Sequence, residues 1–184
     1  DAQTVAGMVT SELQGLSAAG VYGMVKHFPG HGGTSGDSHD GAVSTDKTLE
    51  ELMAEELVPF QSAIDGGVNF VMVGHISAPN VTGDNAPATL SKVLITDVLR
   101  GQMGYNGIVI TDAMNMEAIT GFYNSDKAAV LAVTAGADMI LMPADYNTAY
   151  TGILNAVNDG TITEERINES VTRIVKAKLA MGQP

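Results

Sequence analysis

The sequence predicts an α/β fold in which a parallel sheet is built from repeated strand and helix units. Two observations indicate this class: short strands that are apolar throughout, as at residues 68–73 and 107–110, and helical stretches that separate them. A strand without alternating polar residues is buried on both faces, which is typical of a parallel sheet covered by helices. The composition agrees, because 45% of the 184 residues are hydrophobic and 16% are charged. Residues 1–184 are therefore expected to form one packed α/β unit.

Hydrophobic periodicity assigns the elements along the chain. The predicted strands are residues 21–28, 68–73, 107–110 and 138–142. The predicted helices are residues 2–18, 49–64, 91–103, 126–135, 147–157 and 164–180. Four strands with flanking helices fit either an open doubly wound sheet or half of a (β/α)8 barrel, since a whole barrel typically needs about 250 residues.

Capping residues and helix breakers support the helix boundaries. Thr48 and Glu51 have the spacing of a capping box at the start of the second helix, and Pro59 predicts a kink or a break within it. Ser91 is the expected N-cap of the third helix. Thr163 is the expected N-cap of the last helix, which has acidic residues in its first turn and lysines near its end, as the helix dipole favours.

Composition also excludes several classes of function. Nine Lys and Arg against 21 Asp and Glu give a net charge of −12, which argues against nucleic acid or an anionic membrane surface as the main partner. No apolar run reaches the roughly 18 residues that span a bilayer. The absence of cysteine excludes a disulfide framework, thiol catalysis and Cys-ligated zinc but does not fix the compartment. The chain opens on Asp1 with neither a Met nor a signal peptide, so a processed or truncated product is expected.

Ionisable residues stand at the ends of three predicted strands. The strands end as Lys26-His27, Gly74-His75 and Thr111-Asp112. Carboxyl ends of parallel strands share one edge of the sheet, where ligands and catalytic groups gather. Each residue alone is equally well explained as a strand cap or a solvated loop residue, but three together favour a site because such groups are costly to bury without purpose.

The segment after the first strand is rich in histidine and glycine. Three of the four histidines lie between positions 27 and 39, and the glycines allow sharp turns that bring polar groups together. A phosphate-binding loop is excluded because the Gly-Lys-Ser/Thr pattern is missing. A metal site formed by histidines and Asp37 remains open, although the spacing matches no standard zinc motif.

General acid/base chemistry by Asp37 and His39 is the third interpretation. An imidazole can give and take a proton near neutral pH, and a neighbouring carboxylate fixes its tautomer. Asp112, on another strand end, would face this pair. A carboxylate nucleophile opposite a proton donor is the arrangement for retaining glycoside hydrolysis, although a histidine donor departs from the usual pair of carboxylates.

Two motifs resemble a known family. Lys26-His27-Phe28-Pro29-Gly30-His31-Gly32, followed by Asp37-Ser38-His39, and the later Ile110-Thr111-Asp112-Ala113-Met114-Asn115-Met116 closely resemble family 3 glycoside hydrolases. The resemblance is strongest to the β-N-acetylglucosaminidase branch. It covers essentially the whole chain and corresponds to the second half of the family's (β/α)8 barrel, about four strands with their helices.

The resemblance implies a role for each site residue. Asp112 would be the nucleophile that forms a covalent glycosyl-enzyme, with His39 as the acid/base and Asp37 as its partner. Lys26 and His27 would bind sugar hydroxyls, and His75 would line the pocket or act structurally. The implied reaction is the removal of terminal β-N-acetylglucosamine from peptidoglycan- or chitin-type saccharides, with no metal and no cofactor.

Several alternatives stay open within this resemblance. They are a β-glucosidase or xylosidase of the same fold, a phosphorylase that uses phosphate instead of water, and a non-catalytic sugar-binding fragment. The family's earlier segments, which supply an aspartate and an arginine to the sugar pocket, are expected to be missing. Half a barrel exposes sheet edges and apolar surface, so self-association or pairing with the other half is expected, with poor activity alone. The composition suits a bacterial protein of either the cell envelope or the cytoplasm.

Overall fold

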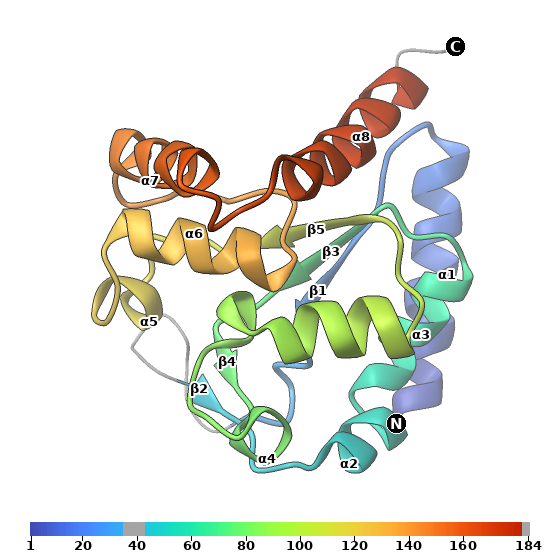
Figure 1. Cartoon of the computed structure of the whole chain (residues 1–184). Coiled ribbons are helices and arrows are strands. Elements are labelled where there is room, and N and C mark those ends of the chain that lie inside the picture. Colours follow the sequence, from blue (N-terminus) through green and yellow to red (C-terminus); the bar gives the residue numbers. More distant parts are fainter. Residues whose placement is uncertain (35–42, 182–184) are drawn as a thin grey trace.

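A parallel sheet of three strands forms the centre of the chain in the computed structural model, which describes residues 1–34 and 43–181. The strand order is β1-β3-β5 (Figure 1). The strands are β1 (Met24–Phe28), β3 (Phe70–Val73) and β5 (Ile108–Thr111). Phe28 is level with Val73 on one side, and Val73 is level with Thr111 on the other. The three carboxyl ends therefore line one rim, as the sequence predicted.

A second parallel sheet, of two strands, is formed by segments that come after β1 and β3 in the chain. It consists of β2 (Val43–Ser44) and β4 (Ile76–Ser77), paired from Val43–Ile76 to Ser44–Ser77. The periodicity of the sequence did not predict these strands because two residues are too few to show a period.

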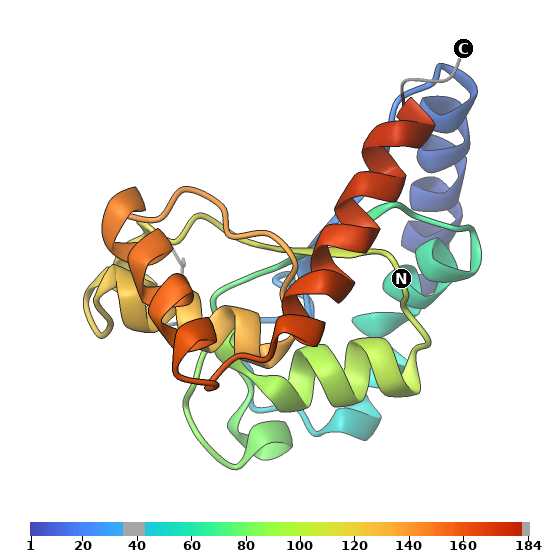
Figure 2. The same ribbon diagram turned by 45° about the horizontal axis from the view of Figure 1, so that its top comes forward.

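Helices cover the main sheet. They are α1 (Ala2–Ala18), α2 (Leu49–Ala54), α3 (Leu57–Asp65), α4 (Pro79–Thr82), the 3₁₀ turn η1 (Ala88–Leu90), the π-helical η2 (Val93–Gln102), α5 (Glu117–Thr120), α6 (Ser125–Ala135), α7 (Tyr146–Asn158) and α8 (Glu164–Met181). Figure 1 shows α1 and α3 on one side of the sheet and α6 and α7 on the other, and Figure 2 shows α8 crossing between the two groups. Across the described ranges, no helix combines the length and the apolar character needed to traverse a bilayer.

The main core lies between the sheet and helices η2, α3 and α6. Val71, Val73 and Val109 of the sheet are fully buried, and so are Leu94 and Leu99 of η2. Burial of these side chains removes apolar area from water and fixes the level of the strands against the helices. The rim thus rests on a rigid layer.

The predicted capping box is confirmed, and the expected break in the second helix is found ahead of Pro59. The Thr48 side chain accepts from the backbone N–H of Glu51, and the Glu51 carboxylate accepts from the backbone N–H of Thr48. Helix α2 then ends at Ala54 and α3 begins at Leu57. Pro59 falls in the first turn of α3, where a residue without an N–H is tolerated because those donors have no partner within the helix.

The prediction of a full fourth strand over residues 138–142 is wrong. In the described part of the chain this segment contributes one parallel bridge, between Met139 and Ile110. The backbone N–H of Leu141 donates to the side-chain oxygen of Thr111, at 3.0 Å, rather than continuing the ladder. Met142 has a φ of +44°, which bends the chain out of the extended geometry of a strand.

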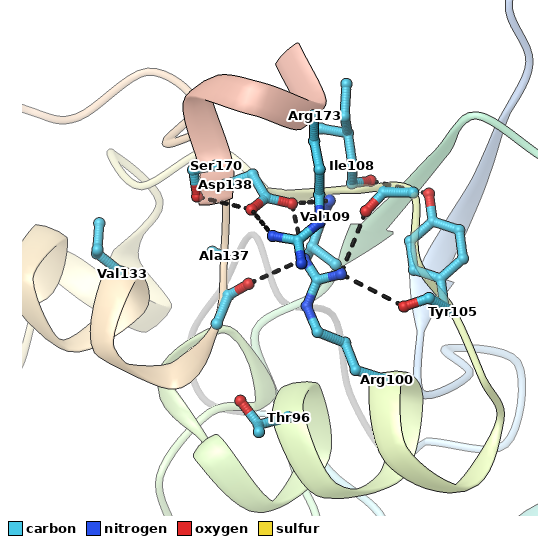
Figure 3. Close-up of polar contacts among 12 residues, drawn as sticks. Thr96, Arg100, Tyr105, Ile108, Val109, Val133, Ala137, Asp138, Ser170 and Arg173 are labelled. Atoms are coloured by element: carbon cyan, nitrogen blue, oxygen red, sulfur yellow. Dashed lines mark hydrogen bonds and ion pairs between the residues drawn. The ribbon is translucent and has the colours of Figure 1, made fainter. Parts of the chain in front are cut away.

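Asp138, at the start of this segment, is a buried carboxylate that connects η2, β5 and α8 at the end of the sheet away from the rim. The Asp138 side chain has an exposed fraction of 0%. It accepts from Arg100 of η2 at 2.6 Å, from the backbone N–H of Val109 at 3.0 Å, and from Ser170 and Arg173 of α8 at 2.6 and 3.1 Å (Figure 3). The cluster holds α8 across the sheet.

Candidate active site

The rim gathers polar side chains from all three strands of the main sheet. Asp112 follows β5, His27 lies near the end of β1, and His75 follows β3. The backbone N–H of Asp112 donates to the carbonyl of Val73 at 2.8 Å. That bond continues the parallel ladder one residue beyond β5, so the position of Asp112 is set by the sheet itself.

Asp112 offers one carboxylate oxygen to the rim. Its Oδ1 accepts from the backbone N–H of Ala113 at 2.8 Å. Its Oδ2 lies 3.6 Å from Nε2 of His27, and the side chain is 15% exposed. One oxygen is therefore held by the backbone, while the other lies nearest His27, which the sequence analysis placed on the same rim.

A glycine allows His27 and Asp112 to approach each other across the central strand. β1 and β5 flank β3, so their side chains meet above its end, at Gly74. A Cβ on Gly74 would lie 3.0 Å from Cβ of His27, which is closer than side chains tolerate without a shift. The ring of His31 packs edge-on against that of His27, with centroids 5.9 Å apart.

Lys26 is exposed on β1 and lies beside a large hollow. Lys26, His27 and His31 line one wall of this cavity of about 700 Å³. Apolar side chains of α1, among them Val5 and Val9, also line the cavity. Acidic residues of α1 and of the segment before α3, among them Glu12 and Glu56, line it as well. The sugar-binding role expected for Lys26 and His27 concerns the end of the cavity at the rim.

The glycine-rich turn after β1 is packed against Glu56. Gly30 has a φ of +122°, and a Cβ there would lie 2.6 Å from Cβ of Glu56. A Cβ on Gly33 would lie 2.5 Å from the Glu56 carboxylate. Oε1 of Glu56 accepts from Lys47 at 2.6 Å. Gly30 is required because its φ is positive and because the Cβ of Glu56 occupies the space that a side chain would need, whereas at Gly33 the clash is with the movable end of the Glu56 side chain.

His75 is buried, with an exposed fraction of 1%. Its Nδ1 lies 2.8 Å from the hydroxyl of Thr89, and its Nε2 lies 2.9 Å from the carbonyl oxygen of Ala113. Burial lowers the pKa of His75, and the carbonyl of Ala113 and the charge of Asp112 oppose that shift only partly. Sequence reasoning did not identify Thr89, which lies 14 residues after His75, in η1.

Asp37 and His39, the predicted acid/base pair, lie outside the described residues. The structure therefore brings together Asp112, His27 and His75 from the predicted set, with Lys26 beside them. Within residues 1–34 and 43–181, no group of three or more His, Asp or Glu side chains has the arrangement of a metal site.

Comparison with known sequences identifies the class of protein. The domain described as "Glycosyl hydrolase family 3 N terminal domain" matches residues 1–177. The chain therefore belongs to glycoside hydrolase family 3, as the two motifs predicted.

Individual relatives place the chain more closely within the family. A protein of Chromobacterium violaceum described as beta-hexosaminidase is 38% identical over 142 residues, which cover 77% of this chain and 39% of the relative. A Cellulomonas fimi protein described as beta-N-acetylglucosaminidase/beta-glucosidase is 32% identical over 191 residues, which cover 99% of this chain and 34% of the relative.

A solved structure supports the same placement within the family as these two sequence relatives. The family 3 beta-N-acetylglucosaminidase from Paenibacillus sp. str. FPU-7 is 43% identical and superposes with a TM-score of 0.90, covering 94% of this chain and 33% of that one. The chain thus matches 33% to 39% of the length of these relatives. The solved structure shares the predicted α/β arrangement of parallel strands and helices over this part.

Proposed function

We propose that this chain carries the catalytic groups of a retaining, exo-acting β-N-acetylglucosaminidase. One observation supports the proposal most directly: a partly exposed carboxylate, Asp112, lies 3.6 Å from His27 at the level where three parallel strands end. The names of the relatives support N-acetylglucosamine as the sugar. Peptidoglycan- or chitin-type saccharides are the proposed source of that sugar.

Asp112 acts as the nucleophile in the proposed reaction. Its Oδ2 attacks the anomeric carbon while the bond from that carbon to the leaving oxygen breaks, and the electron pair goes to the leaving oxygen. His39, oriented by Asp37, gives the leaving oxygen a proton. His39 then takes a proton from water, whose oxygen displaces Asp112 from the anomeric carbon and restores the enzyme.

The surroundings of Asp112 suit this role. Oδ1 is engaged by the backbone of Ala113, so Oδ2 is the oxygen that can reach a sugar. His27 and Lys26 stand on the neighbouring wall of the cavity, where hydroxyl recognition is proposed.

We propose that residues 1–184 form half of a (β/α)8 barrel and pair with further barrel strands, or with a second copy when these are absent. The pairing of β1 described here is to β3 alone, which leaves its other edge open to another strand. Apolar side chains are exposed near that edge and on the last helix, among them Met8, Met24 and Leu179. The greater length of the relatives is consistent with such pairing.

Turnover of an aryl β-N-acetylglucosaminide tests the proposed reaction, measured with the longest natural form of the protein that contains this chain. Asp112→Ala is expected to abolish turnover. The matched control is Asp97→Ala, an exposed aspartate on η2, which should retain wild-type turnover. Loss of activity in both variants, or in neither, would contradict the assignment of Asp112.

His39→Ala and a change of substrate test the remaining parts. With a poor leaving group the loss is expected to be on the order of 10²–10⁴-fold, and with an activated phenol much smaller, because little protonation is then needed. An aryl glucoside as the better substrate would favour a β-glucosidase. A glycosyl phosphate as the product in phosphate buffer would favour a phosphorylase.

A further inference from the structure

His75 has both ring nitrogens engaged inside the protein. Nε2 lies 2.9 Å from the carbonyl oxygen of Ala113, and Nδ1 lies 2.8 Å from the hydroxyl of Thr89. The hydroxyl belongs to a fully buried residue, with an exposed fraction of 0% for Thr89. A sugar hydroxyl could reach a nitrogen of His75 only by displacing one of these partners.

The carbonyl determines where the proton of His75 lies. A carbonyl oxygen only accepts hydrogen bonds, so Nε2 must carry the hydrogen that joins it to Ala113. In a neutral ring Nδ1 is then an acceptor, and the Thr89 hydroxyl donates to it. Burial favours the neutral ring. The bonds therefore run in one direction, from Thr89 through His75 to Ala113.

Ala113 is fixed at both of its polar backbone atoms. Its carbonyl accepts from His75 and from the backbone N–H of Met116 at 3.1 Å, so both lone pairs of that oxygen are used. Its N–H donates to Oδ1 of Asp112. The backbone of residue 113 is thus the link between a buried histidine and the carboxylate that faces the rim.

We propose that His75 is a positioning residue for Asp112. Anchored by Thr89, it holds the Ala113 carbonyl, and through residue 113 it fixes the direction in which Oδ2 of Asp112 points. The inference rests on the proposed role of Asp112 as nucleophile. Of the two roles expected for His75, lining the pocket or acting structurally, it favours the structural one.

Catalysis gives this arrangement a purpose. A nucleophile held by one backbone bond can still rotate if the peptide that supplies the bond can tilt. A misplacement of about 1 Å at the reacting atom can cost roughly 10²-fold in rate. The buried ring of His75 connects the end of β3 with the segment after β5 and prevents the peptide at residue 113 from tilting.

Nuclear magnetic resonance tests the hydrogen-bond direction without any activity measurement. Long-range ¹H–¹⁵N correlations at neutral pH should show His75 as a neutral ring protonated at Nε2. A ring protonated at Nδ1, or at both nitrogens, would overturn the proposal. Because this result does not depend on turnover, an inactive wild-type protein would count against the proposed function alone.

Kinetics on the longest natural form test the consequence. His75→Phe keeps an aromatic ring at this position, somewhat larger than imidazole, and removes both nitrogens. It should lower the rate of glycosyl-enzyme formation, measured with a 5-fluoro N-acetylglucosaminyl fluoride and intact mass, by about 10²-fold, while KM for the aryl substrate stays within about threefold. His75→Gln, which can still donate to Ala113, should recover most of the loss.

Thr89→Val is the second variant, because it leaves the ring in place and removes only its anchor. It should lower the same rate with KM unchanged, and it decides the question if His75→Phe does not fold. Wild-type rates in both variants would overturn the proposal. A raised KM with an unchanged kcat would also overturn it, because that pattern indicates a sugar contact.

Discussion

Replacing Asp138 by Asn is expected to destabilise the protein strongly while leaving its shape unchanged. The carboxylate is buried, and four hydrogen bonds converge on it from Arg100, Val109, Ser170 and Arg173 (Figure 3). Asparagine has the same volume but no charge, and one of its two polar atoms donates instead of accepting. The substitution therefore tests the charge and the hydrogen bonds without creating a cavity.

The expected magnitude follows from how the four bonds divide between the two oxygens. Oδ1 accepts from Ser170 and Arg173, and Oδ2 accepts from Arg100 and Val109. If Oδ2 becomes the amide nitrogen, the bonds from Arg100 and Val109 are both lost. If Oδ1 does, the bond from Arg173 is lost, while the Ser170 hydroxyl can accept from the amide instead of donating. In either orientation a bond from an arginine is lost. Removing one partner of a buried ion pair costs about 3–5 kcal/mol, against a total stability of roughly 5–15 kcal/mol.

Urea denaturation followed by circular dichroism at neutral pH measures this loss. The matched control is Asp97→Asn, the same chemical change at an exposed position of η2, the helix that carries Arg100. It should shift the free energy of unfolding by less than about 0.5 kcal/mol. A loss below about 1 kcal/mol for Asp138→Asn would refute the reasoning, because the cluster would then contribute no more than an exposed ion pair.

Three further predictions concern acid stability, a helix cap and the glycine-rich turn. Burial alone would raise the pKa of Asp138, but the charges of its arginines and the bonds from Ser170 and Val109 outweigh burial and lower it. The stability that the ionised carboxylate contributes is therefore present above the ordinary carboxyl pKa of about 3.9 and is lost as the pH falls below it. Between pH 7 and 3 the Tm of the wild type should therefore fall more than that of Asp138→Asn. Thr48→Ala should cost about 1 kcal/mol in urea denaturation, because the cap of α2 is lost. Gly30→Ala should reduce turnover, because the new Cβ would lie 2.6 Å from Glu56 at a φ of +122°, whereas Gly32→Ala, which meets nothing within 4 Å, should not; equal activity in the two variants would contradict this account.

The position of the candidate site could be predicted from the sequence because it depends on local patterns. Apolar strands that end in His27 and Asp112 place those residues on one rim, since parallel strands share their carboxyl ends. The contact of 3.6 Å between the two side chains agrees with that prediction. The capping box at Thr48 was equally accessible, because its two partners are three residues apart.

Features that depend on tertiary contacts could not be predicted. His75 and His27 both stand at the end of a strand, yet His75 is buried, with an exposed fraction of 1%, whereas His27 faces the rim. The sequence does not show this difference, because the partners that bury His75 lie 14 and 38 residues further along the chain. The fourth apolar stretch failed as a strand for a similar reason: Thr111 captures the N–H of Leu141 with its side chain.

The nucleophile and the glycine-rich turn are held by different physical means. Asp112 is held by a main-chain hydrogen bond to Val73 and, through the backbone of Ala113, by the buried side chain of His75, so its position depends on the sheet and on that ring. The turn at Gly30 is held by the packing of one side chain, Glu56. A retaining reaction needs a carboxylate that attacks and later departs from the same place. In the proposed mechanism, the fixed geometry of the sheet provides that place, so substitutions beneath Asp112 should affect the chemical step more than substrate binding.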